Sequence, residues 1–351
     1  LRERAMAESS PATTMPVASL FLKEKGLPDI SIRKMMNKCR GLSRPGAEDR
    51  LRPNWSFLEK HVGLPKRKIP STVLKCPHLL VLSLPDKLRP MADLLSGLGA
   101  KPEEIAAAVL RFPNVFLYSV EEKLCPLLGF LQGAGVPEPK ISKVFLSCPR
   151  LLSYSIDSKL EPTLRFLEHE VGVKREENCM GKLLARWPHI FGYSIETRLR
   201  PTVLYLENLG LSKEDISRVA IRFPHLLCRD ADKTYRPNVE FLSSLGFDKR
   251  QISSLVSGYP PLLLSSVKNS LQPKIEFLVN VMGKKMEDAV AYPSFFAHSL
   301  GKKIEPRYRK LEKDGIKCSL EGMLSCNQKK FSEGNLGFGQ NPALKLAHLS
   351  L

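Results

Sequence analysis

The chain has 351 residues, of which 43% are hydrophobic, and Lys and Arg outnumber Asp and Glu by 54 to 36. This composition is typical of a folded protein, and no uncharged apolar run approaches the ~20 residues of a membrane-spanning helix, so no such helix is expected. The net charge of +18 favours a polyanionic partner, with nucleic acid ahead of an anionic membrane surface.

Residues 1–19 carry no repeating pattern and include an Ala-, Ser-, Thr- and Pro-rich stretch after Met6. This stretch is compatible with the remnant of a targeting region, but it is too short to identify one. Patterned sequence begins near Leu20. The segment around Gly26 then predicts a half unit over residues 20–38, which would cap a longer array.

The following sequence is organised by two columns of prolines. A first proline stands at positions 77, 113, 149, 188, 224, 260 and 293, with Arg40 in the same place at the start. A second proline follows each of these positions after thirteen residues, at 53, 90, 126, 162, 201, 237, 273 and 306. The repeats are mostly 36 or 37 residues long, with one of 39 and one of 33. Self-similarity at this period predicts an all-α helical-repeat solenoid of about eight units over residues 39–325.

Each unit is expected to hold two α-helices and a short 3₁₀ turn. A Ser or Asp seven residues before the second proline predicts a helix N-cap, and a glycine nine or ten residues after that proline predicts the helix end. A second helix then runs to the next first proline, with isoleucine eight residues before it in most units. The apolar pair after the first proline has room only for a 3₁₀ turn.

The segment FPNVFLYSVEEKLCP, residues 112–126, leaves one local question open. Pro126 could occupy the first turn of a new helix, where its missing N–H matters little. Alternatively, the helix could run unbroken from a cap at Ser119, in which case Pro126 must kink it.

Residues 332–351 lack the repeat and are expected to be a tail apart from the solenoid, which itself spans 20–331. The nucleotide-binding and hydrolase motifs GxxxxGK[ST], HExxH and GxSxG are missing from the sequence, so we expect no enzyme, no cofactor and no small-molecule substrate. The eight cysteines form no CxxC pair. Four of them occupy the column before the first proline, where aromatic residues stand in other units, which predicts buried thiols, no metal site and a reducing compartment.

Three columns of cations are candidates for contacts with nucleic acid. The first stands three residues before the second proline and comprises Arg50, Lys87, Lys123, Lys159, Arg198 and Lys303. The second, two residues before the first proline, contains Lys38, Lys75, Arg111, Arg186 and Arg222. The third, directly before the second proline, contains Arg52, Arg89, Arg200 and Arg236.

Each column also has a structural interpretation. Cations of the first could lie over the neighbouring repeat, because long basic side chains cover apolar surface with their stems. Those of the second stand in the last turn of a helix, where the helix dipole favours positive charge. The third could be an ordinary solvated surface.

An aromatic column and a histidine column also align. Tyr118, Tyr154 and Tyr193 each precede a Ser cap and could stack on unpaired bases, although packing against their own repeat explains them as well. Three histidines follow first prolines, where an exposed turn is the simpler interpretation.

The repeat pattern, seen as FPNVFLYSVEEKLCPLLGFLQGAG, resembles the mitochondrial transcription termination factor (mTERF) family, in its land-plant organellar branch. The runs GYPPLLLSSVKNSLQPKIEFLVNVMG and YPSFFAHSLGKKIEP are similar to one plant subgroup of it. The resemblance covers about residues 20–331. It implies units of two α-helices and one 3₁₀ helix, coiled into a left-handed superhelix whose basic concave side holds nucleic acid.

The same resemblance implies a protein of the chloroplast and/or mitochondrion that binds double-stranded DNA to promote transcription termination or otherwise regulate transcription. A role in maturing organellar tRNA or rRNA, or in intron splicing, by binding RNA is the alternative. A protein-binding scaffold is the third possibility. We expect a monomer with no membrane partner.

Overall fold

The computed structural model describes residues 17–175 and 178–332, and every secondary-structure element within these ranges is helical. By its internal contacts the chain forms two compact units, Leu1–Glu161 and Pro162–Leu351. The predicted solenoid of two α-helices and a 3₁₀ turn per repeat is confirmed in both. Helix α1 begins at Val17. Residues 1–16 and 333–351, which hold most of the segments expected to lie outside the array, are outside the described residues.

The first unit contains the N-terminal half unit and the first repeats. Its α-helices are α1 (Val17–Glu24), α2 (Asp29–Lys38), α3 (Glu48–Ser56), α4 (Ile69–Lys75), α5 (Arg89–Gly97), α6 (Pro102–Arg111), α7 (Cys125–Gly133) and α8 (Glu138–Ser147). The 3₁₀ helices are η1 (Arg40–Ser43), η3 (Lys66–Lys68), η4 (Pro77–Leu80), η6 (Pro113–Leu117) and η8 (Pro149–Ser153). The π-helical turns are η2 (Phe57–His61), η5 (Leu84–Leu88), η7 (Val120–Leu124) and η9 (Ile156–Leu160).

The second unit continues the same order of elements. Its α-helices are α9 (Glu161–His169), α10 (Cys179–Arg186), α11 (Arg200–Asn208), α12 (Lys213–Arg222), α13 (Ala231–Thr234), α14 (Arg236–Ser244), α15 (Lys249–Gly258), α16 (Gln272–Glu276), α17 (Met286–Ala291), α18 (Glu305–Lys313), α19 (Leu320–Leu324) and α20 (Gln328–Ser332). The 3₁₀ helices are η11 (Pro188–Gly192), η13 (Pro224–Leu226), η14 (Pro260–Leu264) and η17 (Pro293–Ala297). The π-helical turns are η12 (Ile195–Leu199), η15 (Val267–Leu271), η16 (Phe277–Val281) and η18 (Leu300–Ile304).

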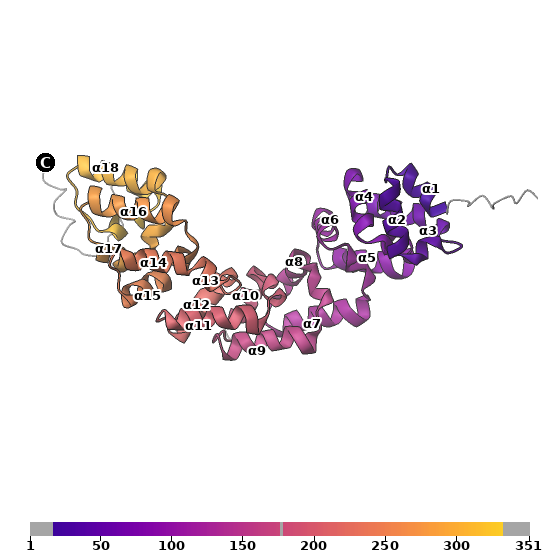
Figure 1. Cartoon of the computed structure of the whole chain (residues 1–351), viewed down its shortest axis with the longest axis horizontal. Coiled ribbons are helices and arrows are strands. Elements are labelled where there is room, and N and C mark those ends of the chain that lie inside the picture. Colours follow the sequence, from indigo (N-terminus) through magenta and orange to yellow (C-terminus); the bar gives the residue numbers. More distant parts are fainter. Residues whose placement is uncertain (1–16, 176–177, 333–351) are drawn as a thin grey trace, which may run out of the picture. The chain divides into compact units, whose positions relative to one another are not determined.

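Within each unit the helices form two layers. In the first unit, α5 and α7 follow one another on one side and α6 and α8 on the other (Figure 1). The isoleucine column faces the core between these layers, and its members Ile69, Ile105, Ile141, Ile216 and Ile252 are all buried. Burying such a column removes apolar surface from water at ~25 cal/mol per Å², which stabilises the stacking of one repeat on the next.

The start of each repeat helix follows the predicted capping chemistry. All seven expected cap residues accept a hydrogen bond from the backbone N–H three residues on: Ser83, Ser119, Ser155, Ser194, Asp230, Ser266 and Ser299. At the other end, Gly99, Gly135, Gly210 and Gly246 have φ of +79°, +83°, +100° and +93°. These are left-handed conformations that favour glycine, so the predicted helix ends are confirmed.

Segment 112–126 shows how the second proline is accommodated. The π turn η7 begins directly after the Ser119 cap, and the N–H of Cys125 donates to the carbonyl of Val120, five residues earlier. Helix α7 continues from Cys125, with Pro126 in its first turn. A proline ring in an uninterrupted α-helix would clash with the carbonyl four residues before it. Pro126 thus lies in the first turn of α7, as the first alternative has it, while the helical chain runs on from Ser119 through a wide π turn instead of the kink that the second alternative required.

Close packing between the last repeats leaves Gly258 no room for a side chain. A Cβ on this residue, at the end of α15, would lie 2.6 Å from Cγ and 2.8 Å from Cβ of Pro293. Because a proline ring is rigid, we expect Gly258→Ala to push the two repeats apart and to lower the free energy of unfolding by ~1–3 kcal/mol. Denaturant unfolding followed by circular dichroism measures this.

Gly129 provides the matched control. It lies within α7 on the exposed surface, and an added Cβ there meets no atom within 4 Å. Gly129→Ala should therefore raise the free energy of unfolding by ~0.5–1 kcal/mol, through the higher helix propensity of alanine. Equal effects of the two substitutions would contradict the packing argument.

Candidate nucleic-acid interface

Half of the first cation column contacts the following repeat. The Nη1 atom of Arg50 donates to the carbonyl of Val81 at 2.7 Å, and Arg198 forms an ion pair with Asp230, the next helix cap, at 3.1 Å. Lys303 donates to the carbonyl of Leu324 at 2.7 Å. These three cations hold neighbouring repeats together, as the structural interpretation of the column predicts.

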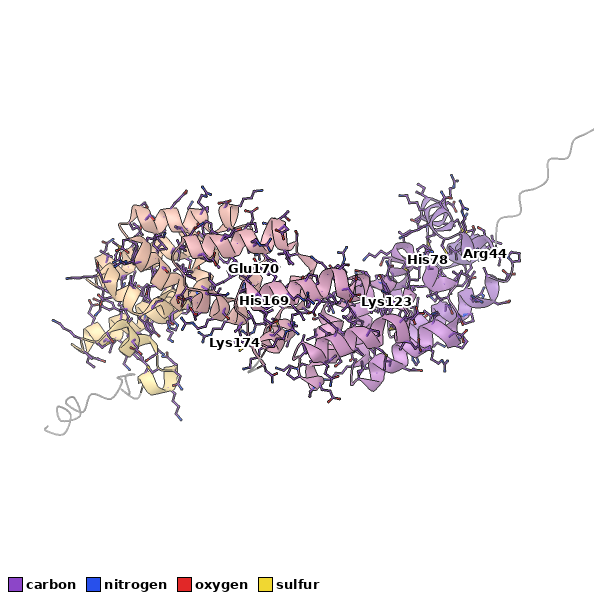
Figure 2. All side chains as sticks on the ribbon, turned by 90° about the horizontal axis from the view of Figure 1, so that it is seen from below. Arg44, His78, Lys123, His169, Glu170 and Lys174 are labelled. Carbon is purple, nitrogen blue, oxygen red and sulfur yellow. The ribbon has the colours of Figure 1, made fainter. Side chains whose placement is uncertain are left out.

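The other three members of this column differ in exposure. Lys87 and Lys123 are exposed, and within the described part of the chain their side chains form no hydrogen bond or ion pair. Lys123 also lines a pocket of about 140 Å³ together with Tyr154 and Asp157. Figure 2 shows Lys123 further along the first unit than Arg44 and His78. Lys159 is half-buried, and burial lowers its pKa.

The second column caps helices of the next repeat. Lys38 donates to the carbonyl of Lys75, Arg111 donates to that of Leu146 at 2.6 Å, and Arg186 donates to those of Ile221 and Arg222 at 3.1 and 2.6 Å. Each acceptor lies in the last turn of the helix that corresponds to the cation's own, one repeat later. A helix dipole therefore favours these cations, as expected. The helix in question is the corresponding helix of the next repeat, and not the one that carries the cation. Arg222 itself is exposed, and its side chain has no such contact in the described residues.

The third column is mostly paired with carboxylates. Arg52 contacts Glu24 at 2.8 Å, and Arg236 pairs with Asp232 four residues earlier. Arg200 bridges Glu170, at 2.7 Å, and Glu196.

Arg89 is the exposed exception: over 17–175 and 178–332, its side chain forms no ion pair or hydrogen bond.

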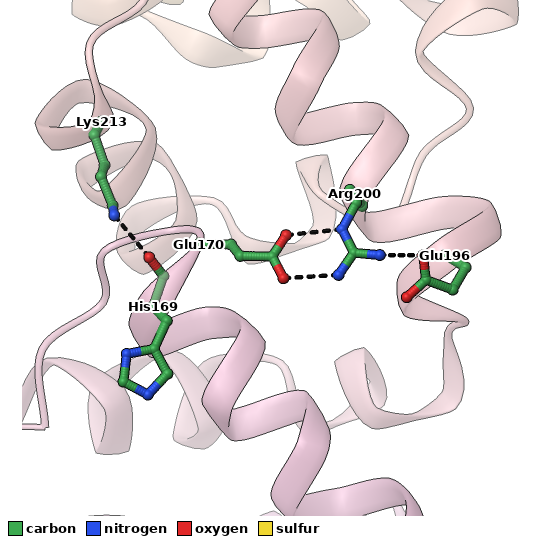
Figure 3. Close-up of polar contacts among 5 residues, drawn as sticks. All are labelled: His169, Glu170, Glu196, Arg200 and Lys213. Atoms are coloured by element: carbon green, nitrogen blue, oxygen red, sulfur yellow. Dashed lines mark hydrogen bonds and ion pairs between the residues drawn. The ribbon is translucent and has the colours of Figure 1, made fainter.

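The Arg200 cluster joins three elements of the second unit (Figure 3). Glu170, which directly follows α9, receives the guanidinium of Arg200 from α11, and this hydrogen bond lowers the pKa of Glu170. Beside it, Lys213 of α12 donates to the backbone carbonyl of His169. Arg200 is therefore held by acids of its own chain, and a phosphate would have to compete with them.

A column of buried polar residues directly after the second proline escaped the sequence analysis. The amide of Asn54 donates to the carbonyls of Leu79 and Leu82 at 3.0 and 2.9 Å. Asn238 does the same to Leu262 and Ser265, at 2.7 and 2.8 Å. Both thereby satisfy carbonyls of the next 3₁₀ turn.

The column continues with Thr202, Lys274 and Arg307, which donate to the backbone carbonyls of Arg229, Phe296 and Met323 respectively. A polar residue recurring among core positions is the signal that could have revealed it.

Positive charge accumulates inside the last repeats. Arg307 is only 2% exposed and stacks on Phe331 at 4.4 Å. Burial, reinforced by Lys303, Arg307 and Lys274, lowers the pKa of His298 from 6.5 to about 4, so this imidazole is neutral at physiological pH. Lys274, Lys303 and Arg307 donate hydrogen bonds to backbone carbonyls, so these cations are not available to an outside ligand.

Tyr118, the first member of the tyrosine column, packs within its own repeat. The ring of Tyr118 stacks on Phe112 with centroids 6.2 Å apart and an angle of 21°. Tyr292 and His298, in the corresponding columns of the last repeat, stack in the same way at 6.5 Å. The histidine column is partly covered, since His189 and His225 both contact the Trp187 ring.

Cysteines of the proline column behave as small apolar residues. Cys39, Cys76, Cys148 and Cys326 are all buried and free, as predicted. Where the structure describes the chain, no group of three His, Cys, Asp or Glu side chains is placed to hold a metal ion. None of the described helices combines the length and apolar character needed to cross a membrane.

Five of the predicted cations therefore stand apart from the rest. They are exposed and have neither an ion-paired nor a hydrogen-bonded side chain among the described residues: Lys75, Lys87, Arg89 and Lys123 in the first unit and Arg222 in the second. We call them the free cations. Desolvated or paired cations must give up a partner to bind phosphate, whereas the free cations need only release counterions.

The comparisons with known proteins agree with the repeat architecture. A segment of 84 residues is 46% identical to transcription termination factor MTERF6, chloroplastic/mitochondrial, of Arabidopsis thaliana, and covers 24% of this chain and 25% of that protein. A second segment of 52 residues is 42% identical to transcription termination factor MTERF4, chloroplastic, of the same plant, covering 15% and 10%. The rice MTERF4 protein is 37% identical over 54 residues, covering 15% and 11%.

These matches span a quarter or less of each relative. The family match is far longer, since residues 21–332 fit the mTERF family as a whole. Proline columns, 3₁₀ turns and stacked helix pairs all fall within that range, and on this evidence the chain belongs to the mTERF family.

Proposed function

We propose that this chain is a nucleic-acid-binding protein of the chloroplast and/or mitochondrion. It binds double-stranded DNA through the free cations and so promotes transcription termination or otherwise regulates organellar transcription. The observation that carries the proposal is the set of five exposed cations without side-chain partners among the described residues of a chain that belongs to the mTERF family.

Two further facts support it. The net charge of +18 raises the local concentration of any polyanion. The matched relatives are named as chloroplastic or chloroplastic/mitochondrial transcription termination factors. Bound tightly enough, such a protein obstructs a polymerase by occupying the duplex, a role that needs no catalytic residue.

Salt dependence of binding provides the first test. We expect the full chain to bind a duplex of ~20 base pairs with log K falling against log salt at a slope of about −4.5 or steeper, since five phosphate contacts each contribute ~0.9. Fluorescence anisotropy at several salt concentrations measures the slope. A slope near zero would contradict electrostatic binding and favour a protein-binding scaffold.

A second experiment distinguishes DNA from RNA. Crosslinking the protein in organelles and sequencing both the recovered DNA and the recovered RNA would identify the bound species. Enrichment of discrete DNA sites at transcript ends supports the proposal. Enrichment of tRNA, rRNA or intron sequences alone would replace it with the RNA-maturation function.

A further inference from the structure

In the second unit, α12, α15 and α17 pack side by side (Figure 1). Residues of these three helices line a hollow. Its volume is about 750 Å³, and it is open to solvent along α15. Gly210, Gly258 and Ala291 are among its lining residues, and none of them carries a long side chain. None of the three cation columns contributes to its lining.

The hollow appears where the second cation column stops. In all but one of the earlier repeats that position carries a long basic side chain, such as Arg186 or Arg222, the exception being Ser147, but in the last two repeats it holds Gly258 and Ala291. The cations that cap neighbouring helices elsewhere are therefore missing here. Two others, Lys249 and Arg250, stand instead in the first turn of α15 and line the same hollow.

The donors around the hollow are unused. Lys249 and Arg250 are exposed, and neither side chain is hydrogen-bonded or ion-paired among the described residues. The hydroxyls of Ser253 and Ser254, on the same helix, likewise have no hydrogen bond there. The Oγ and Cβ atoms of Ser253 lie 3.6 and 3.7 Å from where a Cβ of Gly210 would stand, so this side chain is close to the Gly210 backbone.

The one acid in the lining is already neutralised. Asp215 accepts hydrogen bonds from the hydroxyls of Ser257 at 2.6 Å and Ser212 at 2.9 Å, and it pairs with Arg218. Burial raises the pKa of Asp215, but these hydrogen bonds outweigh it and lower the pKa to about 2. The Asp215 carboxylate is therefore already paired. No unpaired carboxylate in the lining competes for the two cations and the two hydroxyls.

We propose that this hollow binds the phosphodiester backbone of the nucleic acid that the protein holds, with Lys249 and Arg250 on phosphate oxygens and Ser253 and Ser254 donating to them. Charge-assisted hydrogen bonds from ammonium and guanidinium groups suit phosphate, and hydroxyls complete its shell of donors. This inference rests on the proposed function. It adds a contact surface that the repeat columns do not contain.

The test is a charge-matched pair of variants of the full chain. Lys249→Ser/Arg250→Ser removes two cations from the hollow, whereas Lys268→Ser/Lys313→Ser removes two exposed cations elsewhere in the same unit. For the hollow variant we expect duplex affinity to fall about 30-fold at ~0.15 M salt and the salt slope to become shallower by about 1.8. The control should change affinity by about threefold or less, because distant charges are screened.

A neutral substitution separates shape from charge. Ser253→Leu fills the hollow without changing the net charge and should weaken duplex binding, whereas Ser243→Leu, at an exposed position on α14, should not. Thermal unfolding by circular dichroism checks that all four variants remain folded. Equal duplex affinities for the hollow variants and their controls would overturn the assignment.

Further outcomes separate this inference from the function beneath it. If the unmodified chain bound neither duplex nor single-stranded nucleic acid, the proposed function and this inference would both fall. Inorganic phosphate, titrated by calorimetry, is the remaining probe. If it bound the unmodified chain but not the hollow variant, while duplex binding was equal in both, the hollow would be a site for free anions and the backbone assignment would be wrong.

Discussion

Replacing four of the five free cations with serine, in a Lys87/Arg89/Lys123/Arg222 variant, is expected to weaken binding to duplex DNA about a thousandfold at ~0.15 M salt. The reason is that four lost phosphate contacts remove ~3.6 from the salt slope, and at this salt concentration each contact contributes about five- to sixfold. Anisotropy titrations over a range of salt measure both quantities. The loss should be similar for every duplex sequence, because phosphate contacts carry no sequence information.

Four arginines paired with carboxylates make a control of equal charge. Serine at Arg52, Arg200, Arg236 and Arg309 removes cations that contact Glu24, Glu170, Asp232 and Glu305. Since these cations are already neutralised locally, we expect this variant to lose about tenfold or less. If the control variant bound duplex DNA as weakly as the Lys87/Arg89/Lys123/Arg222 variant, only the total charge would matter, and these four residues would have no special role.

A second large effect is expected at the buried polar column. Asn238 is 5% exposed and is the donor to two carbonyls of the next repeat. Asn238→Leu removes the Asn238 donor from both carbonyls; the Leu262 carbonyl still accepts from the N–H of Ser265 at 3.2 Å, but the Ser265 carbonyl loses its donor. A buried polar group left without its hydrogen bond costs about 1–3 kcal/mol, so we expect the free energy of unfolding to fall by ~1–3 kcal/mol in urea or thermal denaturation.

Asn238→Asp tests whether the amide protons are the cause. The size of the side chain is preserved, but a carboxylate would face two carbonyl oxygens, so folding favours the protonated acid and raises its pKa above the unfolded value. An acid whose pKa is raised by folding stabilises the folded protein at pH values below its unfolded pKa. This contribution is lost as the pH rises through its folded pKa. The free energy of unfolding of the Asn238→Asp variant should therefore fall further below that of the unmodified chain at pH 7 than at pH 4. A deficit independent of pH would point to packing instead.

Local chemistry made the ends of the repeat helices predictable. A serine cap, a glycine in the left-handed region and a proline that stops a helix all act within a few residues, and the sequence displays them directly. The π turns were not foreseen, because the spacing from Ser119 to Pro126 fits both a new helix and a distorted one. Choosing between them depends on where the carbonyls of the preceding turn point, which a single sequence does not encode.

The roles of the cations were less accessible for a different reason. Arg50 is 31 residues from its acceptor in the chain and Arg186 is 35 and 36 residues from its two acceptors. Whether such a side chain contacts a neighbouring repeat or solvent is decided by how the repeats stack. The columns were therefore visible in the sequence as sets of basic residues, and only the coordinates separated Lys87 and Lys123 from Arg50 and Arg198.

The capping of α4, α8 and α12 by a cation from an earlier helix also gives these contacts a direction along the chain. Arg111 and Arg186 precede the helix ends that they complete by about one repeat. During synthesis the donor is made first, so each of these three helices can find its cap already folded as the chain emerges from its N-terminus. Deleting N-terminal repeats would therefore leave a helix end without its capping cation, whereas deleting C-terminal repeats would leave only a solvated arginine.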